Sequence, residues 1–368
     1  MAYVIPDPLP WTMLAGPLAA AEDALARLDE RLGQSPIRAG WISRTHFLDA
    51  CASLWLQGEL LHLEDLVLHD AGMDQRAPTH ELTRAHAVLR TRRRIAAAEP
   101  GWAVSELGLA ALSQGREGEA GSVSDDKPAL DHEPAGERAG EGAFDDDAFA
   151  AELAAIDAVL ERSSNVLAGA IPPRAQDPLA LVYDLDWDEP DRLEEWRRGV
   201  EDTRALPPLL AAALALDAWI TIEPLQHRPW LGALVVSGLL GARGKARHHL
   251  PCLNLALRQV MRERRCARDQ PTSLVAFLEA VTLGAGQGIK DHDRWRLTRE
   301  VLERKLSGRR KHSKLPTLID LVLARPLVSA GMIAAELSVT PRAAQDLIAA
   351  LGIREMTGRG RYRAWGVL

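Results

Sequence analysis

Cysteine is scarce in this sequence, and its spacing argues against two kinds of small stabilised domain. Cys51, Cys252 and Cys266 are the three cysteines among 368 residues, and no pair has the C-x-x-C spacing. An odd number of distant thiols argues against a disulfide framework, and the missing spacing argues against a zinc finger. We therefore expect a protein of a reducing compartment, with the cytoplasm as its location.

Long apolar runs are missing as well. The longest uncharged apolar segment, residues 229–242, is too short to span a bilayer. Residues 1–11 contain three prolines and no basic residue, which is unlike a signal peptide. The sequence predicts no association with a membrane.

Phenylalanine and tyrosine are rare, with four and three residues, so leucine, alanine and tryptophan must fill the interior of a chain that is 47% hydrophobic. This composition indicates a mainly α-helical fold, and the length suffices for two or three domains. Apolar residues recur with helical spacing at Leu18, Ala21, Leu25 and Leu28. Further helices are expected at residues 44–56, 63–69, 81–98, 149–167, 192–203, 207–222 and 229–240.

An acidic segment interrupts the helical pattern. Residues 113–147 contain 11 acidic and three basic residues, six glycines and two prolines. Such a segment cannot bury enough apolar surface to offset its ordering entropy. We interpret it as a disordered linker between an N-terminal helical region, residues 1–112, and a central helical domain, residues 148–314. A solvated loop inside one domain is the alternative.

Positive charge is concentrated in the last third of the chain. The net charge is −7, but residues 243–368 hold 24 Lys and Arg against 11 Asp and Glu. Residues 305–314 contribute five of these cations and no acid, which suggests a linker that contacts phosphate groups. A nucleic-acid-binding protein needs such a basic region, although solvated arginine-rich helices give the same count.

Residues 315–368 have the pattern of three short helices followed by a basic strand-turn-strand. Ser329 is expected to cap the second helix, and Thr340 the third, in which Pro341 takes the first position. Gly352 is placed to end the third helix. Its buried face is expected to contain Ala344, Leu347, Ile348 and Leu351.

This order of elements resembles a winged helix-turn-helix domain, which implies that double-stranded DNA is the partner. The third helix of such a domain enters the major groove, and the wing contacts the DNA backbone. Beyond the cap Thr340, Arg342 and Gln345 are the exposed side chains with the length and donors to read base edges.

Three arginines alternate along the predicted wing. Arg359, Arg361 and Arg363 are spaced two apart, so we expect them to share one face and to meet successive phosphates. A small helical module that binds protein is the alternative. The sequence leaves the oligomeric state open, a homodimer included, and it does not name the DNA target.

Two other groups of residues are weak candidates for a site. The three glycines of residues 284–288 follow a predicted helix and no strand, so a helix-breaking loop is expected rather than a phosphate cradle. His227, His248 and His249 have no acidic or cysteine partner with ligand spacing. We expect solvated histidines there, with no metal and no cofactor.

Residues 219–231 read Trp-Ile-Thr-Ile-Glu-Pro-Leu-Gln-His-Arg-Pro-Trp-Leu, between two apolar segments. This stretch resembles the centre of the Fic/Doc family, where a histidine-proline-phenylalanine knuckle precedes a glycine-rich loop. Ser53, four residues before Gln57 and Gly58, is similar to the inhibitory helix of that family. The resemblance implies a Fic-like helical body joined to a C-terminal winged helix, as in uncharacterised bacterial proteins with a helix-turn-helix domain and a domain of unknown function.

The chain departs from that family where the chemistry would lie. Glu223 stands at the position of the catalytic histidine, followed by the retained Pro224. Arg228 and Trp230 fall in the replaced phosphate-binding loop, and Gln57 replaces the inhibitory glutamate. An active member needs the histidine as a base and the loop to hold phosphates, so we expect no catalytic residues here.

These observations predict a DNA-binding transcriptional regulator with a catalytically inactive Fic-like body. The first alternative is a nucleotidyl transferase of the AMPylase type with a rebuilt active site. The second is an interaction scaffold whose winged helix binds protein.

Overall fold

The computed structural model of the chain describes residues 3–73, 77–114, 187–306, 314–357 and 363–367. The described residues up to 114 and from 188 onward belong to one compact unit. The predicted linker at residues 113–147 lies outside the described residues, apart from Ser113 and Gln114 at the end of one helix. The predicted helix at residues 149–167 lies outside them altogether.

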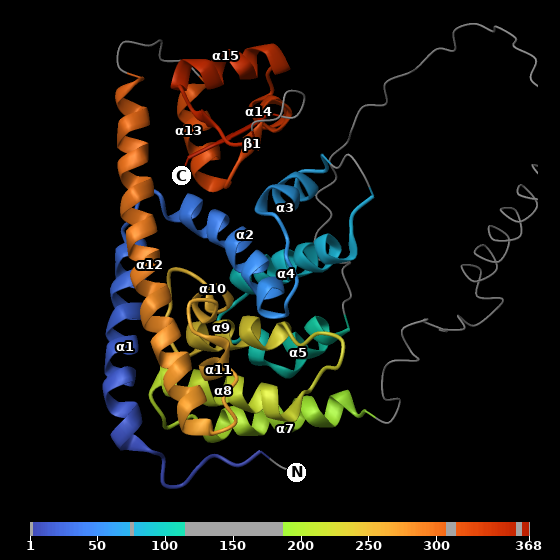
Figure 1. The fold of residues 1–368 in the computed structure, drawn as a ribbon, viewed down its shortest axis with the longest axis vertical. Coiled ribbons are helices and arrows are strands. Elements are labelled where there is room, and N and C mark those ends of the chain that lie inside the picture. Colours follow the sequence, from blue (N-terminus) through green and yellow to red (C-terminus); the bar gives the residue numbers. More distant parts are fainter. Residues whose placement is uncertain (1–2, 74–76, 115–186, 307–313, 358–362, 368) are drawn as a thin grey trace, which may run out of the picture. The chain divides into compact units, whose positions relative to one another are not determined.

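The described chain is mainly α-helical, as its composition predicts (Figure 1). The apolar spacing from Leu18 to Leu28 forms the buried face of the first helix. Before the C-terminal domain, the elements are α1 (Trp11–Gly33), α2 (Arg38–Leu56), α3 (Leu63–Asp70), α4 (His80–Ala97), the 3-10 helix η1 (Trp102–Val104), α5 (Glu106–Ser113), α7 (Glu189–Asp202), α8 (Pro208–Ile222), α9 (Leu231–Ala242), α10 (Leu253–Leu257), α11 (Arg262–Arg265) and α12 (Gln270–Arg304).

The long helix α12 lies beside α1 (Figure 1), and its glycines allow a close approach of two neighbours. The predicted helix-breaking loop is wrong, because residues 284–288 lie within α12. A Cβ at Gly284 would stand 2.6 Å from the Cβ of Ala256 in α10, and a Cβ at Gly288 would stand 3.0 Å from Leu28 of α1. Tertiary packing therefore outweighs the low helix propensity of glycine at these positions.

The centre of the helical body is formed by the two apolar segments that the sequence singles out. In α8 and α9, side chains such as Leu210, Leu214 and Leu234 are completely buried. By length and composition α12 could also cross a membrane, but its Leu274 and Phe277 are buried in this same core. Part of the apolar character of α12 is thus used for packing within the body, while Leu283 and Leu297 are exposed.

A buried ion pair joins α2, α4 and α10. Nη1 of Arg92 lies 2.9 Å from Oδ2 of Asp49, and both side chains are almost fully buried. Asp49 also accepts hydrogen bonds from the Asn254 side chain at 3.0 Å and from the N–H of Leu255 at 2.9 Å. Arg92 donates to the carbonyl oxygens of Leu250 and Pro251. These hydrogen bonds to Asp49 and to both Nη atoms of Arg92 offset the cost of burying the pair, although the Nε of Arg92 has no partner among the described residues.

The C-terminal residues form three helices and a small antiparallel sheet, which is the arrangement of a winged helix-turn-helix domain. The strand order is β1-β3-β2, with Trp365 opposite Val328 on one side and opposite Glu355 on the other. The elements are α13 (Leu315–Ala324), β1 (Val328–Ser329), α14 (Ala330–Leu337), α15 (Pro341–Leu351), β2 (Arg354–Glu355) and β3 (Ala364–Gly366).

Arg44 of α2 connects the body to this domain. Its guanidinium stacks on Trp295 of α12, with 4.8 Å to the ring centroid. Burial lowers the pKa of Arg44 to about 10, so the side chain is still charged at neutral pH. It donates hydrogen bonds to backbone carbonyl groups of the C-terminal domain, those of Val322, Arg325, Pro326 and Val367. The domain is therefore packed against the body as well as joined to it by the chain.

Two glycines of α12, Gly284 and Gly286, provide a matched test of how α12 packs against α10. Nothing lies within 4 Å of a Cβ at Gly286, so we expect Gly286→Ala to raise the free energy of unfolding by about 0.5 to 1 kcal/mol through helix propensity. Gly284→Ala has the same propensity gain but meets Ala256, so we expect a loss of about 1 to 3 kcal/mol. Urea unfolding of the two variants and the parent measures both values. Equal changes in the two variants would contradict the packing role of Gly284.

Candidate nucleic-acid interface

The third helix of the C-terminal domain, α15, begins and ends as the sequence predicts. The hydroxyl of Thr340 accepts a hydrogen bond from the N–H of Ala343 at 3.2 Å, and Pro341 occupies the first turn. Gly352 ends the helix in the left-handed region, at φ 61°. Of the predicted buried face, Ala344, Ile348 and Leu351 are buried and Leu347 is half-buried. The remaining face of α15 is consequently presented to solvent.

That exposed face carries Arg342, Gln345, Asp346 and Ala349. Arg342 and Gln345 have side chains with several N–H donors, the groups that pair with base edges in the major groove. The turn before α15 is short, and Ser338 adopts a left-handed conformation at φ 51° to make it. The preceding helix, α14, is capped by Ser329, which accepts from the N–H of Met332 at 3.1 Å.

Arg363 is the one predicted wing arginine within the described residues, since Arg359 and Arg361 lie outside them. Its Nη2 lies 2.5 Å from Oε2 of Glu355, and this hydrogen bond raises the pKa of Arg363. The guanidinium also lies over the ring of Trp365, 5.3 Å from the centroid. Arg363 therefore already has an acidic partner that a DNA phosphate would have to displace, which the sequence pattern did not indicate.

Lys305 has a different role from the phosphate contact that the sequence suggested for residues 305–314. Its Nζ donates a hydrogen bond to the carbonyl oxygen of Leu351 at 2.5 Å, at the last turn of α15. A cation suits a helix C-terminus, where carbonyl groups lack intrahelical partners. Sequence reasoning missed this contact because the two residues are 46 positions apart, and residues 307–313 lie outside the described chain.

In the segment that resembles the Fic/Doc centre, residues 219–231, side chains of the segment itself occupy the space where a ligand would bind. Glu223 is exposed at the end of α8, in a left-handed conformation at φ 48°, and Pro224 after it is buried. Arg228 donates to the carbonyl oxygen of Leu112 at 3.0 Å, and Trp230 is buried directly before α9. The positions that would hold phosphates thus carry a buried indole and a side chain engaged with the end of α5.

The residues of the inhibitory-type motif stabilise the end of α2. Gln57 donates to the carbonyl oxygen of Ser53 at 3.0 Å, and its side-chain oxygen accepts from Arg84 of α4. Gly58 then turns the chain at φ 87°, in the left-handed region that favours glycine. The residues of the motif therefore end α2 and connect it to α4.

The histidines near residue 248 differ from the expectation of solvated side chains. His249 is buried, and its Nδ1 lies 2.9 Å from Oδ1 of Asp29 on α1. Sequence reasoning missed this pair, because its members are 220 residues apart. Within the part of the chain that the structure describes, no group of three or more His, Cys, Asp or Glu residues could hold a metal ion.

Comparisons with known proteins match two separate regions of the chain. Residues 181–307 match the model for a protein of unknown function (DUF1612), and residues 315–368 match an HTH DNA binding domain. The uncharacterized protein y4cF of Sinorhizobium fredii (strain NBRC 101917 / NGR234) is 49% identical over 372 residues, covering 97% of each chain. A Fic family protein from Desulfovibrio desulfuricans G20 is a similar solved structure, with 14% identity, a TM-score of 0.47 and coverage of 100% of this chain and 98% of that one.

The identity to y4cF extends over both the helical body and the C-terminal domain, so it concerns the whole chain rather than a shared module. The match to the helix-turn-helix model ends at the last residue and begins at the first residue of α13. The chain therefore belongs to the family of the uncharacterized protein y4cF, with a DUF1612 region followed by a helix-turn-helix DNA-binding domain.

Proposed function

We propose that this protein is a DNA-binding transcriptional regulator, active in the bacterial cytoplasm, whose Fic-like body has no nucleotidyl-transferase activity. The observation that carries the proposal is the exposed polar face of α15, in a domain that matches a helix-turn-helix DNA-binding model. Arg342 lies in the first turn of α15, at the end that reaches base edges when a recognition helix enters the major groove.

Electrostatics supports duplex DNA as the partner. The basic residues that exceed the acidic ones from residue 243 onward belong to the part of the chain that contains the winged helix. The negative charge of the whole chain, −7, opposes nonspecific binding to DNA by the rest of the surface. Residues 315–368 hold six Lys and Arg against four Asp and Glu, and residues 243–314 hold 18 against seven, so most of the basic excess lies directly before the winged helix. This distribution favours contact with DNA at the C-terminal end of the chain.

The residues at the Fic/Doc-like segment of the helical body support the proposed lack of nucleotidyl-transferase activity. General base catalysis of nucleotidyl transfer needs a group near the target hydroxyl, and a phosphate site needs free N–H groups at a helix start. Here Glu223 is solvent-exposed at the base position, and the buried Trp230 occupies the loop position before α9. A nucleotidyl transferase would need both features to be rebuilt elsewhere.

The recognition helix gives the first test of this function. We expect Arg342→Ala and Gln345→Ala each to cost about 1 to 3 kcal/mol of binding free energy on the preferred duplex, with relaxed sequence preference, because base contacts are lost. Selection from random duplexes followed by titration of each variant measures both effects. Arg204→Ala is the matched control, since Arg204 is an exposed arginine of the body, paired with Glu201. Failure of the intact protein to enrich any sequence would support a protein-binding module instead.

The wing is expected to affect all DNA sequences about equally. Arg359→Ala and Arg361→Ala should each lower the slope of log affinity against log salt by about one, because one phosphate contact is lost. Arg363→Ala should have a smaller effect, since Glu355 already neutralises this cation. Glu355→Gln should release Arg363 and strengthen binding to every duplex. Titrations at several salt concentrations measure the slopes, and unchanged slopes in all four variants would exclude the wing from the interface.

The proposed lack of nucleotidyl-transferase activity is tested with labelled ATP. We expect no transfer of label to the protein itself or to the proteins of a bacterial lysate, because the residues for base catalysis and phosphate binding are replaced. Glu223→His should not restore transfer, since Trp230 still fills the loop position. If the parent protein transfers label and Glu223→Ala abolishes that transfer, the protein is an active enzyme. This result would contradict the proposed lack of nucleotidyl-transferase activity.

A further inference from the structure

An acidic side chain, Asp346, lies on the exposed face of α15, beside the two residues proposed to contact bases. Successive side chains are rotated by about 100° around a helix axis, so Asp346 lies about 40° from Arg342 on one side and Gln345 about 60° from it on the other. Ala344 and Ile348, two residues before and after Asp346, are buried. Asp346 therefore points away from the core of the domain, in the same direction as Arg342.

The charge of Asp346 has no partner within the part of the chain that the structure describes. Asp320 and Glu355 of the same domain each form an ion pair with an arginine. Asp346 follows Arg342 by four residues, the spacing at which opposite charges pair on a helix, but the structure shows no ion pair between them. Asp346 thus places an uncompensated negative charge on the face proposed to bind a polyanion.

An uncompensated carboxylate on this face opposes DNA binding, because the phosphate groups of both strands repel it. Inside the major groove it has one kind of partner, a base amino group that donates a hydrogen bond. The N4 amino group of cytosine is such a donor, whereas guanine and thymine present acceptors there, which repel a carboxylate. Adenine places its donor beside the acceptor N7, so it is the poorer partner. The chemistry of Asp346 therefore favours cytosine.

The helical rise determines how far this cytosine lies from the base that Arg342 contacts. Residues four apart are separated by about 6 Å along a helix, and successive bases of one strand by about 3.4 Å along the duplex. A helix that follows the groove therefore places Asp346 about two base pairs beyond the contact of Arg342. Arginine pairs best with guanine. The expected target contains a guanine and a cytosine at this separation along the groove.

We propose that Asp346 is a specificity-determining residue of α15, which accepts a hydrogen bond from the N4 amino group of a cytosine in the major groove. This rests on the proposed function, because α15 must lie in the groove, and it adds the identity of one base to that function. The same charge lowers the affinity for duplexes that lack the cytosine. Asp346 thus weakens DNA binding in general and strengthens the preference for one target.

Asp346→Asn and Asp346→Ala separate these two effects. Asparagine has nearly the same size and pairs with N6 and N7 of adenine, so selection from random duplexes should show a preference of about tenfold for adenine in place of cytosine. Asp346→Ala should lose the preference at that position and bind duplexes of unrelated sequence about two- to fivefold more tightly at low salt, because a repulsion is removed. Both variants should keep the preference at the position that Arg342→Ala relaxes, which shows that α15 is still folded.

Glu336→Gln is the matched control, because Glu336 is an exposed acid on the neighbouring helix α14 and has no ion pair within the described ranges. It should leave the preference at every position unchanged. A cytosine preference that both Asp346 variants retain, or a target without this cytosine, overturns the role of Asp346 and leaves the proposed function standing. The same change of preference in Glu336→Gln would also overturn it, since loss of charge alone would then be the cause. A parent protein that enriches no sequence refutes the proposed function, and the role of Asp346 fails with it.

Discussion

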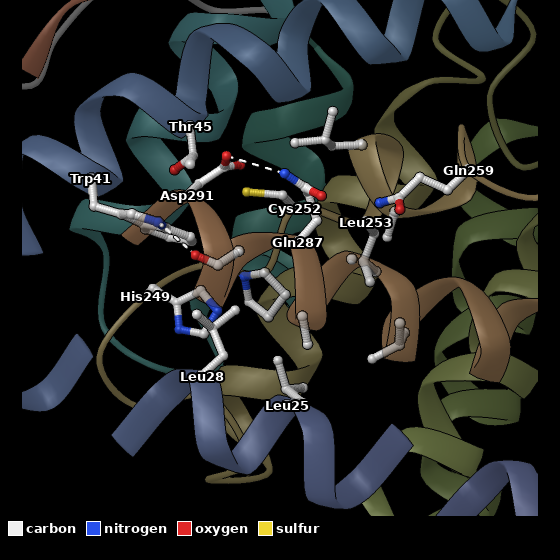
Figure 2. A pocket seen from close by; sticks show the side chains of 17 residues that line it. Leu25, Leu28, Trp41, Thr45, His249, Cys252, Leu253, Gln259, Gln287 and Asp291 are labelled. Atoms are coloured by element: carbon white, nitrogen blue, oxygen red, sulfur yellow. Dashed lines mark hydrogen bonds between the residues drawn. The ribbon is translucent and has the colours of Figure 1, made fainter. Parts of the chain in front are cut away.

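The buried pair of Asp49 and Arg92 is the interaction on which the helical body depends. Two charges removed from water are tolerated only when each has further hydrogen bonds, and here these bonds go to residues 250–255. The pair thereby fixes a segment that has little regular structure of its own, between the end of α9 and α10. Loss of either partner would leave an unpaired charge in the interior, at a cost of about 3 to 5 kcal/mol. The same segment, with α1, α2 and α12, lines a cavity of about 40 Å³ (Figure 2), so the polar network determines the shape of that cavity.

A second buried cation, Arg44, also lies on α2. This helix therefore contributes Asp49 to the ion pair of the body and Arg44 to the contact with the C-terminal domain. The partners of Arg44 are carbonyl groups of the C-terminal domain and the ring of Trp295, with no carboxylate within the hydrogen-bond distances described for it. Carbonyl groups at the end of α13 lack intrahelical partners, so an arginine can satisfy several of them at once. Because Lys305 also holds the last turn of α15, both α2 and α12 fix the domain that carries the recognition helix.

What the sequence predicts correctly is local. Ser329, Thr340 and Gly352 act within one helical turn, so the bounds of α14 and α15 follow from cap and stop residues. What it misses depends on distant partners. The glycines of α12 are typical of a loop until Ala256 is placed against Gly284 and Leu28 against Gly288. His249 is an ordinary exposed histidine until Asp29 pairs with it. The alternation of charges predicts a phosphate contact for Arg363, which stays a prediction, but it does not indicate the pairing of Arg363 with Glu355.

The first turn of α9 is shaped by the packing of aromatic side chains. A helix start that holds phosphate must leave its N–H groups open, which is why glycine is frequent there. Gly232 remains in that turn, but a Cβ on it would stand 2.4 Å from the indole of Trp219, so this glycine serves close packing. Trp219 in turn meets Trp196 edge to face, at 5.2 Å between ring centroids, and Trp196 donates its N–H to the carbonyl oxygen of Ala215. The start of α9 is therefore occupied by close packing, because these indoles belong to the hydrophobic core of α7, α8 and α9.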